Sequence, residues 1–275
     1  MRLAAVAAII AATGAAFVAA SPATAEGPKD PLNSVLWDYV HEQILEGAPV
    51  VFDDRVQVFA PMVVEDGRLV PVSVRADGIP GVTQILVFAD LNPIPRAVLL
   101  EPLKVEPYVA LRMKVNEGTA IRAAVRTLDG LWHLGGTVVA APGGGCAAPR
   151  LTAGDADWED HLGEVRGRAW TTADGGERLR ILVRHPMDTG LVDGIPEFFV
   201  ERITVTDGGG AEIARMQVWS AMSTDPVLTL ELPPAAAGQG GFTVQARDSD
   251  ANEFAGTIPA PATTMPPVSL QEVMR

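Results

Sequence analysis

The chain has only one cysteine, Cys146, among its 275 residues. A single cysteine excludes an intramolecular disulfide, and it also excludes zinc and iron–sulfur sites built from several thiolates. A chain of this length is long enough to bury one large hydrophobic core or two of ordinary size. Any chemistry of Cys146 must therefore take place without a second thiol from the same chain.

Histidine is also scarce, and the usual catalytic motifs are missing. None of the four histidines stands at metal-ligand spacing from another. His185-Pro186-Met187 carries two soft-metal side chains close together, but its proline and the following Gly190 indicate a loop after a strand. There is no Gly-x-Ser-x-Gly elbow and no Gly-x-Gly-x-x-Gly motif between a strand and a helix. We therefore expect no catalytic residue, no metal and no cofactor, and we expect that the protein is not an enzyme.

Basic residues are outnumbered, with 21 Lys and Arg against 34 Asp and Glu, which gives a net charge of −13. Nucleic acids require clustered Lys and Arg on the protein that binds them. The acidic balance therefore argues against a nucleic acid as partner.

The first 25 residues have the pattern of a secretory signal peptide. Met1-Arg2 carries the positive charge, an alanine-rich apolar stretch follows, and Ala23-Thr24-Ala25 supplies the small residues of a cleavage site before Glu26. An uncleaved membrane anchor is the alternative, but the apolar stretch is short and weakly apolar for a span of about 20 residues. We predict a periplasmic protein that has no membrane contact once the signal is removed.

The rest of the chain changes from a helical period to a period of two. Residues 26–49 are predicted to hold a short helix, capped by Asp30 and with Pro31 in its first turn. Its expected apolar stripe consists of Val35, Leu36, Tyr39, Val40 and Ile44. Alternating apolar residues then predict strands at 70–75, 109–115, 121–126, 179–184, 214–219 and 242–247, with Gly-containing turns between several of them.

This pattern predicts an all-β fold of two antiparallel, Ig-like or fibronectin-like β-sandwiches in tandem. The expected domains are residues 50–146 and 160–259. A stretch rich in Ala, Gly and Pro interrupts the strand pattern between them, and we place the linker at residues 147–159. A Pro-rich tail is expected over residues 260–275.

Cys146 follows three glycines, Gly143, Gly144 and Gly145. Since glycine has no Cβ, this segment is predicted to be a flexible arm that can enter a narrow site on another protein. A cysteine is mainly protonated at neutral pH unless a cation lowers its pKa, and Arg150 is the nearest basic residue in sequence. The residues alone leave a second interpretation equally open, namely an inert thiol in a flexible linker.

The first half resembles SoxY, the Ig-like subunit of the sulfur-oxidation carrier SoxYZ. The similar segments in the chain are Ala60–Gly67 followed by Val70-Pro71-Val72, then Asn92–Pro95, Val109–Val115, Ile121–Ala123 and Gly144-Gly145-Cys146. The second half resembles SoxZ through Arg184–Gly190, Ile195-Pro196, Ser220–Met222, Asp225-Pro226 and Phe242–Asp250. Two motif sets in this order are more specific than either set alone.

This resemblance implies a periplasmic carrier whose cysteine holds a sulfur intermediate covalently, with Cys146 as the attachment residue. It also implies that the SoxY-like and SoxZ-like domains pair within the chain, and that the partners are c-type cytochromes and Sox-type enzymes. Covalent attachment suits the charge of the chain, because so acidic a surface would repel a free anion such as thiosulfate.

The chain departs from the family pattern at its arm, since Ala147-Ala148-Pro149 follow Cys146 and the arm is joined to the second domain. It therefore looks like the fused SoxYZ-like proteins associated with quinoprotein (PQQ-dependent) alcohol dehydrogenases. Three hypotheses follow: a covalent carrier, a non-covalent accessory module for such a dehydrogenase or its cytochrome, and a dimer linked by a Cys146–Cys146 disulfide. The cargo is not specified by the sequence.

Overall fold

The computed structural model describes residues 29–148, 158–238 and 240–261. The signal peptide predicted at residues 1–25 lies outside these residues, as does all of the predicted tail beyond residue 261. Within the described part of the chain, no helix is both long enough and apolar enough to cross a membrane.

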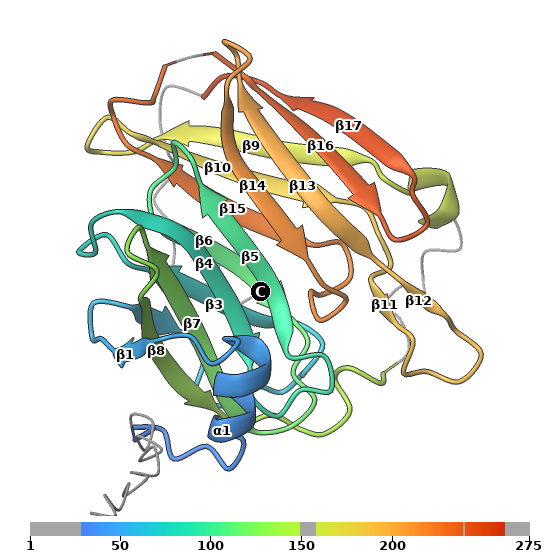
Figure 1. Ribbon diagram of the computed structural model, residues 1–275. Helices are drawn as coiled ribbons and strands as arrows, with labels where there is room; N and C mark the ends of the chain where they lie inside the picture. Colours follow the sequence, from blue (N-terminus) through green and yellow to red (C-terminus); the bar gives the residue numbers. More distant parts are fainter. Residues whose placement is uncertain (1–28, 149–157, 239, 262–275) are drawn as a thin grey trace, which may run out of the picture.

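The prediction of an all-β fold is confirmed, because the strands form two large sheets and one small one. Figure 1 shows the larger sheet in front and the six-stranded sheet behind it. The nine-stranded sheet has the order β1 (Val50–Phe52), β8 (Trp132–Val139), β7 (Thr119–Thr127), β4 (Val82–Ala89), β5 (Arg96–Pro102), β14 (Glu212–Val218), β13 (Val200–Asp207), β16 (Phe242–Asp248) and β17 (Glu253–Ile258). The six-stranded sheet has the order β2 (Gln57–Phe59), β3 (Val70–Arg75), β6 (Tyr108–Met113), β15 (Val227–Leu232), β10 (Glu177–Val183) and β9 (Val165–Thr171), and the small sheet pairs β11 (Asp188–Thr189) with β12 (Glu197–Phe198).

Both large sheets continue from the first half of the chain into the second. In the nine-stranded sheet, β5 pairs antiparallel with β14 over five residues, from Val98↔Val218 to Pro102↔Ala214. In the six-stranded sheet, β6 pairs with β15 through Ala110↔Thr229 and Leu111↔Leu228. One cluster of buried hydrophobic residues lies between the sheets and runs through both halves. The two sandwiches therefore join edge to edge, which satisfies main-chain groups that an isolated edge strand would expose.

The N-terminal segment covers part of the outer face of the nine-stranded sheet (Figure 1). It consists of the short helix α1 (Trp37–Tyr39) and the π-helical turn η1 (Val40–Ile44). Trp37, Val40 and Leu45 pack there with Phe88 of β4 and Trp132 of β8 in a second hydrophobic cluster. The sheet is therefore buried on both faces in this region, and β4 and β7 do not show a clean alternation of burial.

The helix differs from the sequence prediction. It begins only at Trp37, and Val35, which was expected on its apolar face, is 87% exposed. Asp30 does not cap the helix; its carboxylate accepts hydrogen bonds from the backbone N–H groups of Leu32 (3.1 Å) and Ser34 (2.7 Å) in the turn that precedes it. The sequence pattern missed this because the carboxylate is also held by an arginine far away in the sequence.

That arginine is Arg122 of β7, which is buried under the N-terminal segment. Its guanidinium lies 2.7 Å from the carboxylate of Asp30 and 2.9 Å from that of Asp90, and it also faces the ring of Trp37 at 5.1 Å. Burial alone would raise the pKa of Asp30, but the hydrogen bonds from Arg122 and the backbone outweigh it and hold that pKa below its ordinary value. Arg122 thus fastens the N-terminal segment to the sheet.

Replacing Arg122 by alanine should destabilise the fold strongly. Two buried carboxylates would lose their counter-charge, which typically costs about 3–5 kcal/mol of unfolding free energy. Urea unfolding should show this loss, whereas Arg126→Ala, at an exposed position on the same face of β7, should cost less than about 1 kcal/mol. Equal losses of unfolding free energy in the two variants would contradict the conclusion that buried Arg122 holds the N-terminal segment on the sheet.

Candidate functional site

Cys146 lies in a packed segment that follows β8 and sits against the second half of the chain. Its own carbonyl accepts a hydrogen bond of 2.7 Å from the Thr189 hydroxyl, in β11. The backbone N–H of Gly144 donates to the Asn116 carbonyl at 2.8 Å, so the segment is held to the first half as well. Only 1% of the Cys146 surface is exposed. In this structure the thiol is enclosed between the two halves.

The three glycines before Cys146 have different surroundings. A Cβ on Gly145 would run into the carbonyl oxygens of Val115 and Gly67, so this position requires the absence of a side chain. Gly144 has a positive φ of 89°, which favours glycine, while a Cβ on Gly143 would meet only the Asn116 carbonyl, at 3.9 Å. Two of the glycines thus fit the segment into its packed position. The flexible arm expected from Gly143, Gly144 and Gly145 stays a prediction about movement out of that position.

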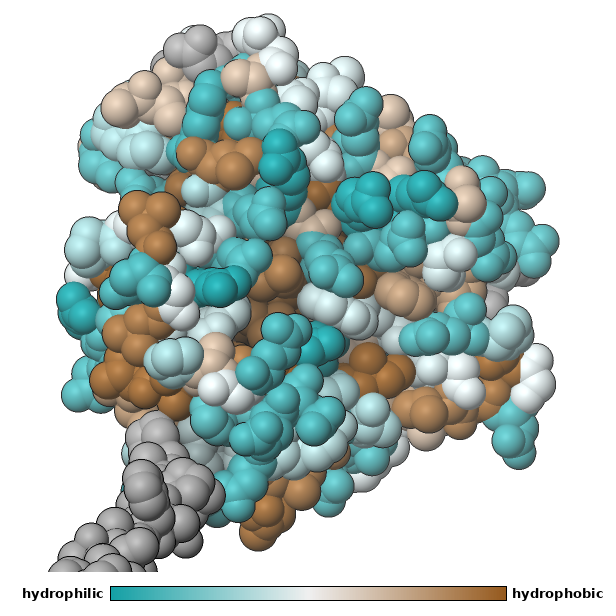
Figure 2. All heavy atoms as spheres, in the orientation of Figure 1, coloured by the Kyte–Doolittle hydropathy of each residue, from teal (hydrophilic) through white to brown (hydrophobic). Residues whose placement is uncertain are grey.

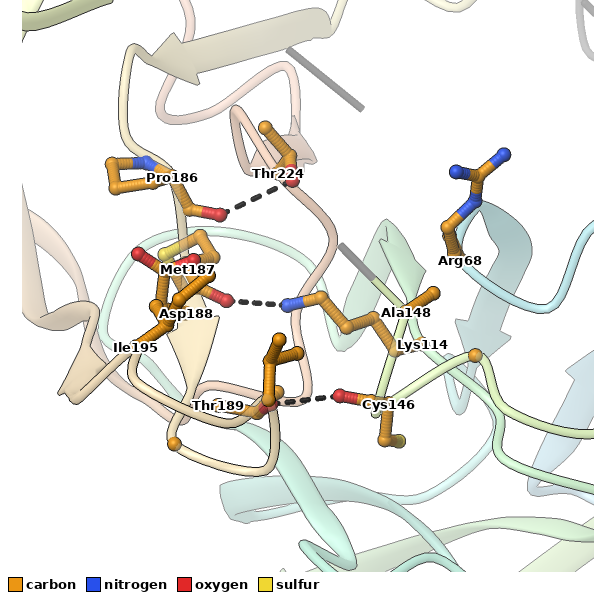
Figure 3. A pocket seen from close by; sticks show the side chains of 13 residues that line it. Arg68, Lys114, Cys146, Ala148, Pro186, Met187, Asp188, Thr189, Ile195 and Thr224 are labelled. Carbon is orange, nitrogen blue, oxygen red and sulfur yellow. Dashed lines mark hydrogen bonds between the residues drawn. The ribbon is translucent and has the colours of Figure 1, made fainter. Parts of the chain in front are cut away.

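The segment closes a small pocket at one end of the six-stranded sheet (Figure 3). Its walls include Arg68 before β3, Lys114 after β6, Met187 and Thr189 after β10, and Cys146 itself. The cavity has a volume of about 20 Å³. This is room for about one water molecule, so the packed position admits a thiol but no large group attached to it.

Lys114 is a cation of the pocket whose charge acts on the thiol. Its side chain is buried, and its Nζ donates to the backbone carbonyls of Met187 (2.6 Å), Ser220 (2.8 Å) and Met222 (2.7 Å). All three acceptors belong to the second half of the chain, so Lys114 joins the halves at the site (Figure 3 shows the bond to Met187). Burial lowers the pKa of Lys114 to about 8, although the nearby Cys146 and Asp188 act in the opposite direction.

Burial also governs the thiol. It raises the pKa of Cys146 to about 11, and the charge of Lys114 offsets only part of this effect. Only the thiolate is a good nucleophile, so Cys146 is nearly unreactive at neutral pH while it remains in the pocket. The cation expected from the sequence was Arg150, which lies outside the described residues.

The strand predicted over residues 109–115 includes Lys114, which lies just beyond the observed strand. β6 ends at Met113, and the chain then leaves the sheet, where the Lys114 N–H donates to the Ala221 carbonyl at 2.6 Å. A lysine at the end of an apolar strand was the available signal, but only the pairing of the halves gives it partners.

Asn92 braces the first-half side of the site. Its amide donates to the Lys114 carbonyl at 2.7 Å and its side-chain oxygen accepts from the Asn116 N–H at 2.9 Å. The Asn116 carbonyl in turn accepts from Gly144. A continuous set of hydrogen bonds therefore links the Asn92 loop to the segment that carries Cys146.

The segment His185-Pro186-Met187 lies in the loop after β10, as the sequence indicated. His185 is buried beside Phe198, with their ring centroids 4.4 Å apart, and its Nδ1 accepts a hydrogen bond of 3.1 Å from the Met187 N–H. The Met187 sulfur accepts from the Val200 N–H at 3.3 Å. These contacts shape the pocket wall. Across the residues that the structure describes, His, Cys, Asp and Glu side chains form no group of three that could hold a metal ion.

Comparisons with known proteins assign a family to each half of the chain. The family model "Sulfur oxidation protein SoxY" matches residues 41–146, and "Sulphur oxidation protein SoxZ" matches residues 165–259. Among solved structures, the sulfur carrier protein SoxY from Chlorobium limicola f thiosulfatophilum is similar, with 26% sequence identity over 38% of this chain and 94% of that chain, and a TM-score of 0.34. Among curated proteins, none matches the sequence significantly. The match to SoxY ends at Cys146.

The alkylation of Cys146 should depend on pH as a buried thiol does. With a pKa of about 11, the rate constant with iodoacetamide should rise about tenfold per pH unit from pH 7 to 10. In urea the same cysteine should level off near its ordinary pKa of about 8.5. A native profile that levels off at that pH would contradict the burial of the thiol in solution.

Gly145→Ala should expose Cys146, because the added methyl group has no room beside Val115 and Gly67. We expect alkylation at pH 8 to be at least about tenfold faster than in the wild type, in the direction of the free-thiol rate. Gly143→Ala is the matched control and should leave the rate unchanged, since that position is open. Thermal unfolding of each variant checks that the fold is retained, and a folded Gly145→Ala protein that reacts as slowly as the wild type would refute the packing argument.

Proposed function

Since the first half of the chain belongs to the SoxY family and the second half to the SoxZ family, we propose that this sulfur-oxidation carrier holds its cargo covalently on Cys146. The proposal includes presentation of the bound intermediate to partner enzymes, and export to the periplasm by the signal predicted at residues 1–25. The chain itself supplies no catalytic group in this proposal. The reactions are carried out by the partners.

The observation that carries the proposal is the position of the thiol. Cys146 is the only cysteine and the last residue of the SoxY match, and it lies at the junction of the two families' domains. The contacts that fix this segment run through its backbone, from Thr189 to the Cys146 carbonyl and from Gly144 to Asn116. Chemistry at the sulfur does not alter the groups that make these contacts, so the same contacts are available again once the thiol is free.

The pocket has room for the free thiol of Cys146 but not for Cys146 with cargo attached. Attachment of thiosulfate through its terminal sulfur adds two sulfur atoms and three oxygens to Cys146, which exceeds the room for about one water next to the thiol. We infer that the packed position holds the free thiol and that the loaded segment lies outside the pocket. Departure from the pocket also removes the burial that raises the pKa of Cys146.

The loading step requires an electron acceptor. When the terminal sulfur of thiosulfate is joined to Cys146, one S–S bond forms, the thiol proton is released and two electrons leave. A c-type cytochrome is the class of partner that accepts these electrons, and a Sox-type enzyme or a quinoprotein dehydrogenase is the class that would act on the bound group. Other thiol-linked cargo, including a persulfide, uses the same attachment atom.

One observation favours a second candidate function. The burial of Cys146 and its raised pKa are also what a cysteine that merely fills the junction would show. In that case the protein would act as a non-covalent accessory module for a periplasmic PQQ-dependent alcohol dehydrogenase or its cytochrome. Its outer surfaces would then carry the function.

Intact-mass spectrometry of protein purified from its native compartment should reveal an adduct that maps to Cys146. Cys146→Ser should abolish the adduct and the growth on the sulfur source that depends on this protein. Gly143→Ala should retain both the adduct and that growth. An unmodified thiol under every sulfur source tested, together with full function of Cys146→Ser, would overturn the carrier proposal in favour of the accessory module. A band of twice the monomer mass on a non-reducing gel would instead identify a disulfide-linked dimer.

A further inference from the structure

The outer face of the six-stranded sheet carries six of the 21 Lys and Arg residues of this acidic chain. We call this surface the basic face. It consists of Arg75 on β3, Arg112 on β6, Arg166 and Arg168 on β9, and Arg178 and Arg180 on β10.

The strand period places these arginines on one side. In β10 the side chains of Leu179 and Ile181 are buried in the core, while Arg178 and Arg180 alternate with them and are half-buried and exposed, respectively. In β9, Arg166 and Arg168 are exposed and Ala169 is buried. Antiparallel register then aligns Arg168 directly with Arg180, and Arg180 with Thr229 of β15. The register therefore places Arg168 and Arg180 side by side on the outer face of the sheet.

Acidic side chains neutralise only part of the basic face. Glu231 of β15 pairs with both Arg75 and Arg178, at 2.9 and 2.5 Å. Asp77 also pairs with Arg75, and Glu164 pairs with Arg166, each at 2.8 Å. In the part of the chain that the structure describes, Arg180 forms no ion pair, and Arg168 lies over the Trp170 ring at 5.5 Å. The charges of Arg168 and Arg180, which are neighbours across β9 and β10, are thus not neutralised by an ion pair among the described residues.

Two arginines, Arg112 and Arg180, influence each other near the junction of the halves. Burial lowers the pKa of Arg112, and the positive charge of Arg180 lowers it further. Arg112 belongs to the first half and Arg180 to the second, so the positive region crosses the β6–β15 junction. The opposite side of the sandwich, seen in Figure 2, mixes hydrophilic residues with several separate hydrophobic patches.

The basic face ends at the pocket of Cys146. Lys114 directly follows β6, Arg68 precedes β3, and the loop with Met187 follows β10, so one end of the sheet supplies the pocket walls. A protein bound on the basic face would have Cys146 at its edge. This brings a surface of distinct charge next to the only thiol.

We propose that the basic face is a docking surface for the acidic surface of a partner protein. The chain as a whole is acidic and repels such a partner, so a face that gathers six arginines favours one orientation in which the two proteins meet. The arginines are spread over several strands, which suits an extended protein surface. That the bound partner exchanges cargo with Cys146 rests on the proposed function, but the docking surface itself does not.

The probe for this proposal is a fluorescein-labelled peptide of about ten glutamates, measured by fluorescence anisotropy at about 20 mM salt, where screening is weak. The wild type should bind it, and binding should weaken as salt rises. The double variant Arg168→Gln/Arg180→Gln should bind about fivefold more weakly, in line with the small energy of each exposed charge pair. The double variant Arg202→Gln/Arg247→Gln makes the same change of charge on the nine-stranded sheet, where these residues pair across β13 and β16, and should bind within about twofold of the wild type.

Absence of binding at low salt, or an equal loss in both double variants, would overturn the docking surface. Competition by sulfate as strong as that by the peptide, at equal total charge, would also overturn it and identify a site for small anions instead. Cys146→Ser should bind the peptide like the wild type. Failure of the carrier proposal would therefore leave this result unchanged, and failure of peptide binding would leave the mass of the Cys146 adduct unchanged.

Discussion

The pairing of edge strands between the two halves is the constraint on which the site depends. β5 with β14 and β6 with β15 bring together main-chain groups that each half alone would expose to solvent. Loops from both halves consequently meet at one end of the six-stranded sheet. The pocket of Cys146 has walls from both sides of this junction, and neither half contains it alone.

Lys114 shows the energetic consequence of that pairing. A buried ammonium group is costly unless its three hydrogens find acceptors, and here the acceptors are the carbonyls of Met187, Ser220 and Met222. Separation of the halves would remove all three bonds at once. The same burial that lowers the pKa of Lys114 raises that of Cys146. The positive charge of Lys114 lowers the pKa of Cys146, whereas burial raises it. The effect of burial is the larger one in the packed state.

The sequence was sufficient for the parts of the structure that repeat locally. Alternating residues in the stretches that became β3, β7, β10 and β16 predicted strands, and the single cysteine after three glycines marked the candidate site. It was insufficient where distant contacts override the local pattern. Asp30 was expected to cap a helix but pairs with buried Arg122. Lys114 was expected within the strand over 109–115, but it lies beyond the end of β6 and its Nζ binds the second half. Both errors involve charged residues whose partners lie far away in sequence.

The fusion of the two domains limits how the thiol can reach a partner. A free terminal arm can extend in any direction, but Cys146 is tied on one side to β8 and on the other to the second half. The seven residue steps from Val139 to Cys146 reach at most about 25 Å when fully extended. A thiol tied at both ends can rise from its pocket only as part of a loop, so the partner must come to the junction. Under the proposed function, the surface around the pocket must therefore bring the partner close. The outer face of the six-stranded sheet, which ends at this pocket, carries six arginines in a chain with a net charge of −13.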